Sequence, residues 1–200
     1  MPSSPSTIGR RERNKLEKLE RITAAATELF AEHGVDDVTT QQIAEKADVG
    51  AGTLFLYAKT KGELLLLVQN TRYAAALESG RSRAETIDDV LEAVLAVVAP
   101  IVECNRVQVD NGRTYLREMV FGDPSEPHHA EARSIVEQTE RVVAEIISTR
   151  SSVDPDAAAT MARVVSAVTF LTMAGSADAE ISPADILEAI RTQLAAVLPR

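Results

Sequence analysis

Residues 39–61 constrain the fold of this chain more than any other segment, because they read as two short helices joined by a tight corner. Thr39 lies three residues before Gln42, which is the spacing of a capping box, so a helix is predicted to begin there. Asp48 occupies the corner, where a left-handed backbone is needed and aspartate tolerates it better than most side chains. A second helix is predicted over residues 51–58. The segment therefore has the pattern of a helix-turn-helix.

The second helix of such a pair suits the major groove of B-DNA, which admits one α-helix and meets its first turn at the base edges. Ala51 and Gly52 are small and let the backbone approach a duplex. Thr53 can bond a phosphate or pack its methyl group on thymine. Phe55 and Tyr57 are predicted to face the groove or its walls. This segment therefore predicts a DNA-reading element.

A basic stretch precedes the helix-turn-helix. Arg10, Arg11 and Arg13 follow a segment rich in Ser and Pro that is predicted to be disordered. Two interpretations stay open for these arginines. They form either a solvated helix face or an arm that contacts phosphate or the minor groove.

The segment from about Arg21 to Leu66 resembles the DNA-binding domain of the TetR/AcrR family of bacterial transcriptional regulators. The residues that carry the resemblance are AAATELFAEHGVDDVTTQQIAEKADVGAGTLFLYAKTKGELL. Their order is a first helix ending in Phe and Gly, a Thr-capped second helix, Ala-x-Val at the corner, Gly-Thr-Leu, and Lys before Glu-Leu-Leu. The resemblance implies a regulator that binds a palindromic operator as a homodimer and is released by a small-molecule effector, most often as a repressor.

The resemblance also implies roles for single residues. Gln41 matches the position at which the family often touches a base, Tyr57 matches a phosphate contact, and Lys61 matches a lysine that clamps backbone phosphate. Physical reasoning adds Thr39 and Thr40, near the free N–H groups that begin a helix. The full predicted DNA-binding set is Arg10, Arg11, Arg13, Thr39, Thr40, Gln41, Ala51, Gly52, Thr53, Phe55, Tyr57 and Lys61.

Three residues depart from the family pattern. Phe55 stands where Tyr is usual, Leu56 is apolar where a polar or larger aromatic group is common, and Ala58 replaces a bulky wedge. The predicted recognition helix is therefore poor in base-reading donors. Such departures also suit an alternative function, a protein-protein adaptor or ligand sensor that no longer meets an operator, although Thr39, Tyr57 and Lys61 speak against it.

The rest of the chain predicts an all-α fold of about nine helices, since no strand signal occurs. A flexible basic arm is predicted over residues 1–15, a DNA-binding domain over 16–62, and a ligand-binding and dimerisation body over 63–200. A loop is expected at 79–82, a kink or early stop at Pro100, and a break near Asn111–Gly112. Other predicted helix boundaries are Leu16–His33 for the first helix, a linking helix to about Leu77, a start near Thr86 or Asp89, a helix from about Glu126 to Arg150, and starts at Asp154–Pro155 and Ser182–Pro183.

Apolar stripes on the last two helices suit a four-helix bundle across a two-fold axis. The predicted dimer interface is Met161, Val164, Val165, Val168, Leu171, Ile186, Leu187, Ile190 and Leu194. The candidate cavity residues are Leu67, Tyr73, Val98, Cys104, Tyr115, Met119, Phe121, Phe170 and Met173. Core packing is the competing interpretation for each of them. A lining with few aromatics favours an aliphatic or acyl-type effector.

Charge distribution sharpens the functional prediction. The net charge is −9, but residues 1–62 hold nine basic and nine acidic side chains, so the acidic excess lies in the body. An acidic body on a neutral, locally basic head suits a protein that meets phosphate in one orientation. The single cysteine, Cys104, excludes an internal disulfide and fits a reducing cytoplasm.

Other functional classes find little support in the sequence. No run of about 18 apolar residues suggests a membrane span, and the N-terminus has no signal-peptide pattern. Phosphate-loop, GxSxG and HExxH motifs are missing, so we expect neither an enzyme nor a cofactor. His128, His129 and Glu131 hint at a metal but lack a fourth ligand.

Overall fold

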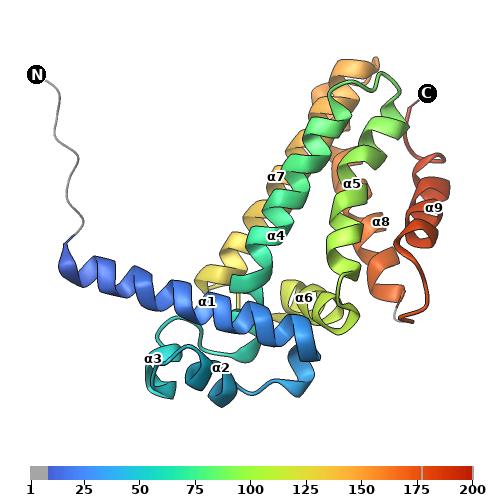
Figure 1. Ribbon diagram of the computed structural model, residues 1–200. Coiled ribbons are helices and arrows are strands. Elements are labelled where there is room, and N and C mark those ends of the chain that lie inside the picture. Colours follow the sequence, from blue (N-terminus) through green and yellow to red (C-terminus); the bar gives the residue numbers. More distant parts are fainter. Residues whose placement is uncertain (1–8, 177, 200) are drawn as a thin grey trace, which may run out of the picture.

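The computed structural model describes residues 9–176 and 178–199, and these residues form nine α-helices and no strand (Figure 1). The prediction of an all-α fold is confirmed. The helices are α1 (Arg10–Asp37), α2 (Thr40–Lys46), α3 (Ala51–Leu54), α4 (Lys61–Ala84), α5 (Val90–Arg106), α6 (Val109–Phe121), α7 (Pro127–Arg150), α8 (Pro155–Gly175) and α9 (Pro183–Leu194). In Figure 1, α1 to α3 form a head, and α4 rises from it into a helical body.

The first helix is longer than the sequence predicted. It begins at Arg10 rather than the predicted Leu16, so residues 10–15 of the predicted arm are helical. Residues 1–8 of that predicted arm lie outside the described residues. Gly34 has a φ of 76° and breaks the helix near its end, as its glycine predicted.

The helix-turn-helix forms from the local signals that predicted it. Thr39 accepts a hydrogen bond from the Gln42 N–H, and the Gln42 side chain accepts one from the Thr39 N–H, so the capping box is complete. Asp48 adopts a left-handed φ of 51° at the corner. The second helix is shorter than predicted, because α3 ends at Leu54 and residues 55–57 continue as a turn.

The loop predicted at residues 79–82 is wrong, because α4 runs unbroken to Ala84. Gly80 lies against the backbone of α5, where an added Cβ would stand 2.6 Å from the Val97 carbonyl oxygen. Glycine is therefore needed for a close helix crossing rather than for a turn. Pro100 does not end α5 either, since the helix continues to Arg106. The predicted break at Asn111–Gly112 is also wrong, because both residues lie in the first turn of α6.

Two clusters of buried side chains make up the core, and α4 contributes to both. The head cluster combines Ile22, Phe30 and Ile43 with the first turns of α4, and it extends to Tyr115 of α6 and Ile135 of α7. The body cluster joins α5, α7, α8 and α9. The head therefore shares one buried core with α4, α6 and α7.

The last two helices bury different parts of the predicted dimer interface. Val165, Ile186, Ile190 and Leu194 lie in the core of their own protomer and cannot contact a second chain. That part of the prediction is wrong, because each of these helices has an inward face that the remaining helices cover. Leu171 and Val164 instead lie on the surface, with 72% and 37% of their area exposed.

By length and composition, α8 is the one helix among the described residues that could cross a membrane. Its most apolar 18-residue window has a mean hydropathy of 1.5, although Arg163 interrupts the apolar run. The structure buries 28% of that window, so much of an apolar helix is left uncovered by its own chain.

Candidate DNA-binding surface and effector cavity

The helix-turn-helix presents its small and polar residues to solvent. Gly50, which caps α3, and Gly52 have no neighbour that an added Cβ would meet within 4 Å, so the backbone there faces open space. Leu54 is fully buried. The other predicted contacts on the two helices, namely Thr39, Thr40, Gln41, Ala51, Thr53, Phe55 and Tyr57, are exposed or partly exposed. A duplex can therefore reach the face that the sequence indicated.

Lys61 is bound to the protein's own backbone. Its Nζ donates to the carbonyl oxygens of Asp36 and Val38, at 3.2 and 3.1 Å. These carbonyls lie at the end of α1 and in the link to α2, so the lysine ties the start of α4 to that link. An ammonium group has three N–H donors, so one is left for a phosphate oxygen.

Tyr57 is also engaged within the head. Its hydroxyl donates to the Lys15 carbonyl oxygen over 3.1 Å, which fastens the turn after α3 to α1. The hydroxyl has a single hydrogen, so in this arrangement it cannot donate to phosphate as well. The sequence did not predict this contact, because Lys15 lies 42 positions earlier in the chain.

The basic residues near the start of α1 differ in their pairing. Arg13 forms a loose surface pair with Glu17 at 3.8 Å, whereas Arg21 donates to Asp48 of the corner at 3.0 Å. Arg10 and Arg11 are exposed on the first turn of the helix. The structure therefore gives the predicted arm a helical form that extends away from the rest of the head (Figure 1).

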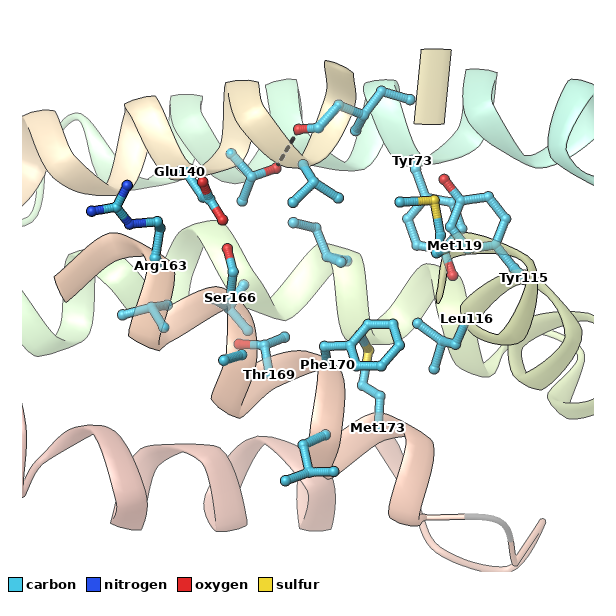
Figure 2. Close-up of a pocket in the computed structure, with 18 of the residues that line it drawn as sticks. Tyr73, Tyr115, Leu116, Met119, Glu140, Arg163, Ser166, Thr169, Phe170 and Met173 are labelled. Atoms are coloured by element: carbon cyan, nitrogen blue, oxygen red, sulfur yellow. Dashed lines mark hydrogen bonds between the residues drawn. The ribbon is translucent and has the colours of Figure 1, made fainter. Parts of the chain in front are cut away.

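The body contains a cavity of about 570 Å³ between α4, α5, α6, α7 and α8 (Figure 2). Six of the nine predicted residues line it, namely Tyr73, Val98, Tyr115, Met119, Phe170 and Met173. The other three do not line it, because Leu67 and Cys104 pack against the head cluster and Phe121 is 83% exposed at the end of α6. The volume lies within the range of roughly 300–1,000 Å³ that small-molecule sites occupy.

The cavity wall changes in polarity along its length. Figure 2 shows Tyr73, Tyr115 and Met119 at one end, and Glu140, Arg163 and Ser166 at the other. The sequence prediction missed the polar end, together with apolar lining residues such as Leu116 and Ile135. A signal for Arg163 did exist, because it is the one charged side chain in residues 157–175. The cavity therefore suits a mainly apolar molecule with a polar group at one end.

Two tyrosines stack at the apolar end of the cavity. The rings of Tyr73 and Tyr115 lie 4.2 Å apart at an interplanar angle of 20°. The Tyr73 hydroxyl accepts from Asn105 Nδ2 at 2.9 Å, and the Tyr115 hydroxyl donates to Asn70 Oδ1 at 3.1 Å. Burial raises the pKa of both phenols above the ordinary value, so both stay protonated at neutral pH.

The N-terminal end of α7 meets the head. Lys59 pairs with Glu126, and His128 Nε2 lies 2.9 Å from the Tyr57 carbonyl oxygen. A carbonyl oxygen accepts hydrogen bonds, so His128 carries its hydrogen on Nε2 in this contact. Among the described residues, no group of three His, Cys, Asp or Glu side chains could hold a metal ion. In this structure the His128 ring hydrogen-bonds the first turn of α7, in the body, to the turn after α3, in the head.

Glu63 lies buried at the same junction, and its Oε2 finds no hydrogen-bond partner among the described residues. Its pKa is raised, mainly because burial penalises the charged form and further because Glu126 is near, while His128 and His129 oppose the rise. The unfolded carboxyl titrates near 4.5. The ionised group therefore costs stability at neutral pH, and this cost fades as the pH falls through the raised pKa.

Replacing Glu63 by glutamine is accordingly expected to raise the melting temperature at neutral pH. The gain should shrink toward pH of about 4, where both the folded and unfolded states hold the proton. Thermal unfolding across this pH range measures it, with Glu78→Gln, an exposed site on the same helix, as the control. A lower melting temperature at neutral pH would show instead that the fold requires the carboxylate.

The fold and the exposed helix-turn-helix define a DNA-binding regulator with a helical body. Residues 22–68 match the family model of bacterial regulatory proteins, tetR family. The segment is thus a TetR-family DNA-binding domain, and the described chain has the fold of TetR-family transcriptional regulators along its length. No curated protein matches the chain in sequence.

Solved structures show the same architecture over almost the whole chain. A TetR transcriptional regulator from Rhodococcus sp. RHA1 is 16% identical with a TM-score of 0.71, covering 92% of this chain and 96% of its own. FadR of Thermus thermophilus, a TetR-family repressor in complex with lauroyl-CoA, is 25% identical with a TM-score of 0.68, covering 91% and 96%. RolR in complex with resorcinol is 16% identical with a TM-score of 0.71, covering 93% and 89%.

Proposed function

We propose that this protein is a homodimeric repressor that binds a palindromic operator in the cytoplasm and leaves it when a small molecule fills the body cavity. The observation that carries the proposal is the buried core that connects the head to the helices around the cavity. The TetR-type head shares its buried core with α4 and α6, and both of these helices also line the 570 Å³ cavity. A change in cavity occupancy can therefore alter the spacing of two heads that must match half-sites roughly 34 Å apart.

The proposed DNA contacts divide into two groups. The N-terminal ends of α2 and α3 approach the duplex, with Gln41 to read a base and Thr40 and Thr53 to bond phosphate. The Thr39 hydroxyl and N–H both donate to Gln42 within the capping box, so Thr39 acts as the cap. Arg10, Arg11 and Arg13 supply positive charge beside the groove. Lys61 adds its remaining N–H to a phosphate while it holds the link between α1 and α2.

The proposed dimer forms through the uncovered stripe of α8. Val164, Val168 and Leu171 follow one another at intervals of four and three residues, so they share a face of the helix. Met161, one turn before Val164 and Val165, is partly buried beside this face, and Leu187 of α9 is partly buried against the body core. A second copy would cover an apolar helix that its own chain leaves exposed, and the two-fold axis would set the distance between the heads.

The proposed effector is an aliphatic or acyl-type molecule with one polar end. The cavity wall is mostly apolar, and Arg163 and Glu140 lie together at its polar end. The bound lauroyl-CoA of the 25% identical FadR supports this choice, because that ligand carries a fatty acyl chain. Thermal unfolding with lauroyl-CoA tests it, since a ligand at 100 times its dissociation constant adds about 2.7 kcal/mol.

DNA binding is tested by two sets of variants in gel retardation on the protein's own promoter region. The double replacement Arg10→Ala and Arg11→Ala is expected to weaken binding to every duplex and to lower the salt slope by about 2, because two phosphate contacts are lost. Gln41→Ala is expected to change sequence preference with a smaller loss of affinity. Unchanged binding by both variants would contradict these contact assignments.

One observation favours a second candidate function. Leu56 is 83% exposed and Phe55 is 44% exposed in the recognition element, by which we mean residues 51–58. These two side chains form an apolar surface on a turn that would face DNA. A protein-protein adaptor would use such a surface. The same retardation assay separates the two functions, because an adaptor would fail to retard any duplex at low salt.

A further inference from the structure

The wall of the cavity contains one end of a hydrogen-bonded chain that reaches the recognition element. Tyr115 of α6 lines the cavity and donates through its hydroxyl to Asn70 Oδ1 of α4, at 3.1 Å. Asn70 is 1% exposed, and its Nδ2 donates to the His128 carbonyl oxygen at 2.9 Å and to Glu131 at 3.0 Å. The ring of the same His128 donates to the Tyr57 carbonyl oxygen at 2.9 Å.

Each link in this chain joins a different element. Tyr115, Asn70 and His128 belong to α6, α4 and α7, and Tyr57 belongs to the turn that directly follows α3. The chain therefore crosses from the body to the helix-turn-helix in three hydrogen-bonded steps. Because Asn70 is buried, it cannot exchange these partners for water without leaving polar groups unpaired.

Tyr73 provides an internal comparison, since it stacks on Tyr115 in the same cavity wall. Its hydroxyl accepts from Asn105 of α5, so this bond stays within the body. Two stacked phenols thus differ in where their hydrogen bonds lead. The hydrogen bond of Tyr115 leads toward the head, and that of Tyr73 leads to α5 within the body.

Other contacts fasten the head without touching the cavity. Lys59 pairs with Glu126, and the buried Asn111 of α6 bonds the backbone of α1 at Phe30 and Val35. None of these residues lies in the cavity wall. These contacts therefore do not begin in the cavity wall, whereas the chain from Tyr115 begins where a ligand would sit.

We propose that the chain Tyr115–Asn70–His128 positions the recognition element and reports cavity occupancy to it. The proposal rests on the proposed function and names its regulatory residues. A molecule that displaces the Tyr115 ring draws its hydroxyl from Asn70. Asn70 then loses the partner that fixes its amide, and the amide no longer holds the His128 backbone that sets the ring against Tyr57.

The test compares Tyr115→Phe with Tyr73→Phe in the full chain, because each variant removes one hydroxyl from the same stack. Amide hydrogen exchange without ligand is the first measurement. Tyr115→Phe is expected to speed exchange in residues 51–58 by roughly 2- to 10-fold, the effect of one net hydrogen bond. Tyr73→Phe should leave these residues unchanged and act, if anywhere, on α5. Equal exchange at residues 51–58 in both variants overturns the proposal.

The second measurement is operator release by lauroyl-CoA. Release is compared at equal cavity occupancy, set for each variant from its own lauroyl-CoA affinity in thermal unfolding. At that occupancy wild type and Tyr73→Phe should be released alike, whereas the operator affinity of Tyr115→Phe should fall at least about 5-fold less. Equal release by both variants overturns the proposal. A wild type that binds no DNA, or no lauroyl-CoA, counts against the proposed function or its effector class, and the exchange measurement still decides the positioning role.

A third variant tests whether the residues act as one chain. Asn70→Ala should speed exchange in residues 51–58 as Tyr115→Phe does, and adding Tyr115→Phe to it should have no further effect, because the chain is already broken. Additive effects of the two replacements would show independent contacts and overturn the chain. If Asn70→Ala does not fold, the tyrosine pair decides the matter.

Discussion

Replacing Asn111 by alanine is expected to destabilise the protein by about 2–5 kcal/mol. Asn111 is 1% exposed, and its side chain accepts from the Val35 N–H and donates to the Phe30 carbonyl oxygen, both at 2.7 Å. Alanine would leave two buried backbone groups without partners, and each such group costs about 1–3 kcal/mol. Denaturant unfolding monitored by circular dichroism measures the loss.

The position of Asn111 makes this effect more than a local one. Phe30 and Val35 flank Gly34, where α1 breaks, so Asn111 fixes the end of the first helix to the body. The neighbouring Asp110→Ala is the control, because Asp110 is exposed and forms only a loose surface pair with Arg113 at 3.7 Å. A decrease in unfolding free energy below about 1 kcal/mol for Asn111→Ala would mean that water replaces the amide. The contact of Asn111 with the end of α1 would then not be needed for stability.

Replacing Leu171 by glutamate is expected to yield a monomer with operator affinity reduced by about 100-fold or more. Leu171 is 72% exposed on the apolar face of α8, and a charge there would be buried without a partner in the proposed dimer. A single head loses the benefit of two linked half-sites, which is worth about 10²- to 10⁴-fold. Sedimentation measures the mass, and gel retardation measures the affinity.

Two further variants separate dimerisation from other effects. Leu171 also lines the cavity, whereas Val164 lies on the same face of α8 outside the cavity wall, so Val164→Glu should produce the same monomer. Val107→Glu is the matched control, because Val107 is also 72% exposed but lies at the end of α5. A Leu171→Glu protein that remains dimeric would place the interface elsewhere and remove α8 from the proposal.

The sequence by itself determined the features that depend on near neighbours. The capping box at Thr39, the N-caps at Asp154 and Ser182 and the left-handed corner at Asp48 all form where they were predicted. Each involves atoms within four positions of one another, so local chemistry suffices. The motif from about Arg21 to Leu66 likewise identified the DNA-binding head, because its residues recur in a fixed order and spacing. The family model matches residues 22–68.

Glycine and proline misled the prediction where distant elements decide their role. Gly80 was expected in a loop, yet it lies inside α4 because α5 passes too close for a side chain. Pro100 was expected to kink the helix or end it early, yet it lies buried within a helix that continues to Arg106. Both residues weaken a helix taken alone, and tertiary contacts offset that cost.

Only the tertiary structure decided which apolar and polar groups remain available for function. An apolar stripe does not say whether its own chain or a second chain covers it, so Ile190 and Leu171 look alike in the sequence although one is buried and the other is exposed. Tyr57 and Tyr115 likewise look like ordinary tyrosines until their partners are known. The physical reason is the same in each case. Burial and hydrogen bonding depend on which distant groups the fold brings together, and no local pattern contains that information.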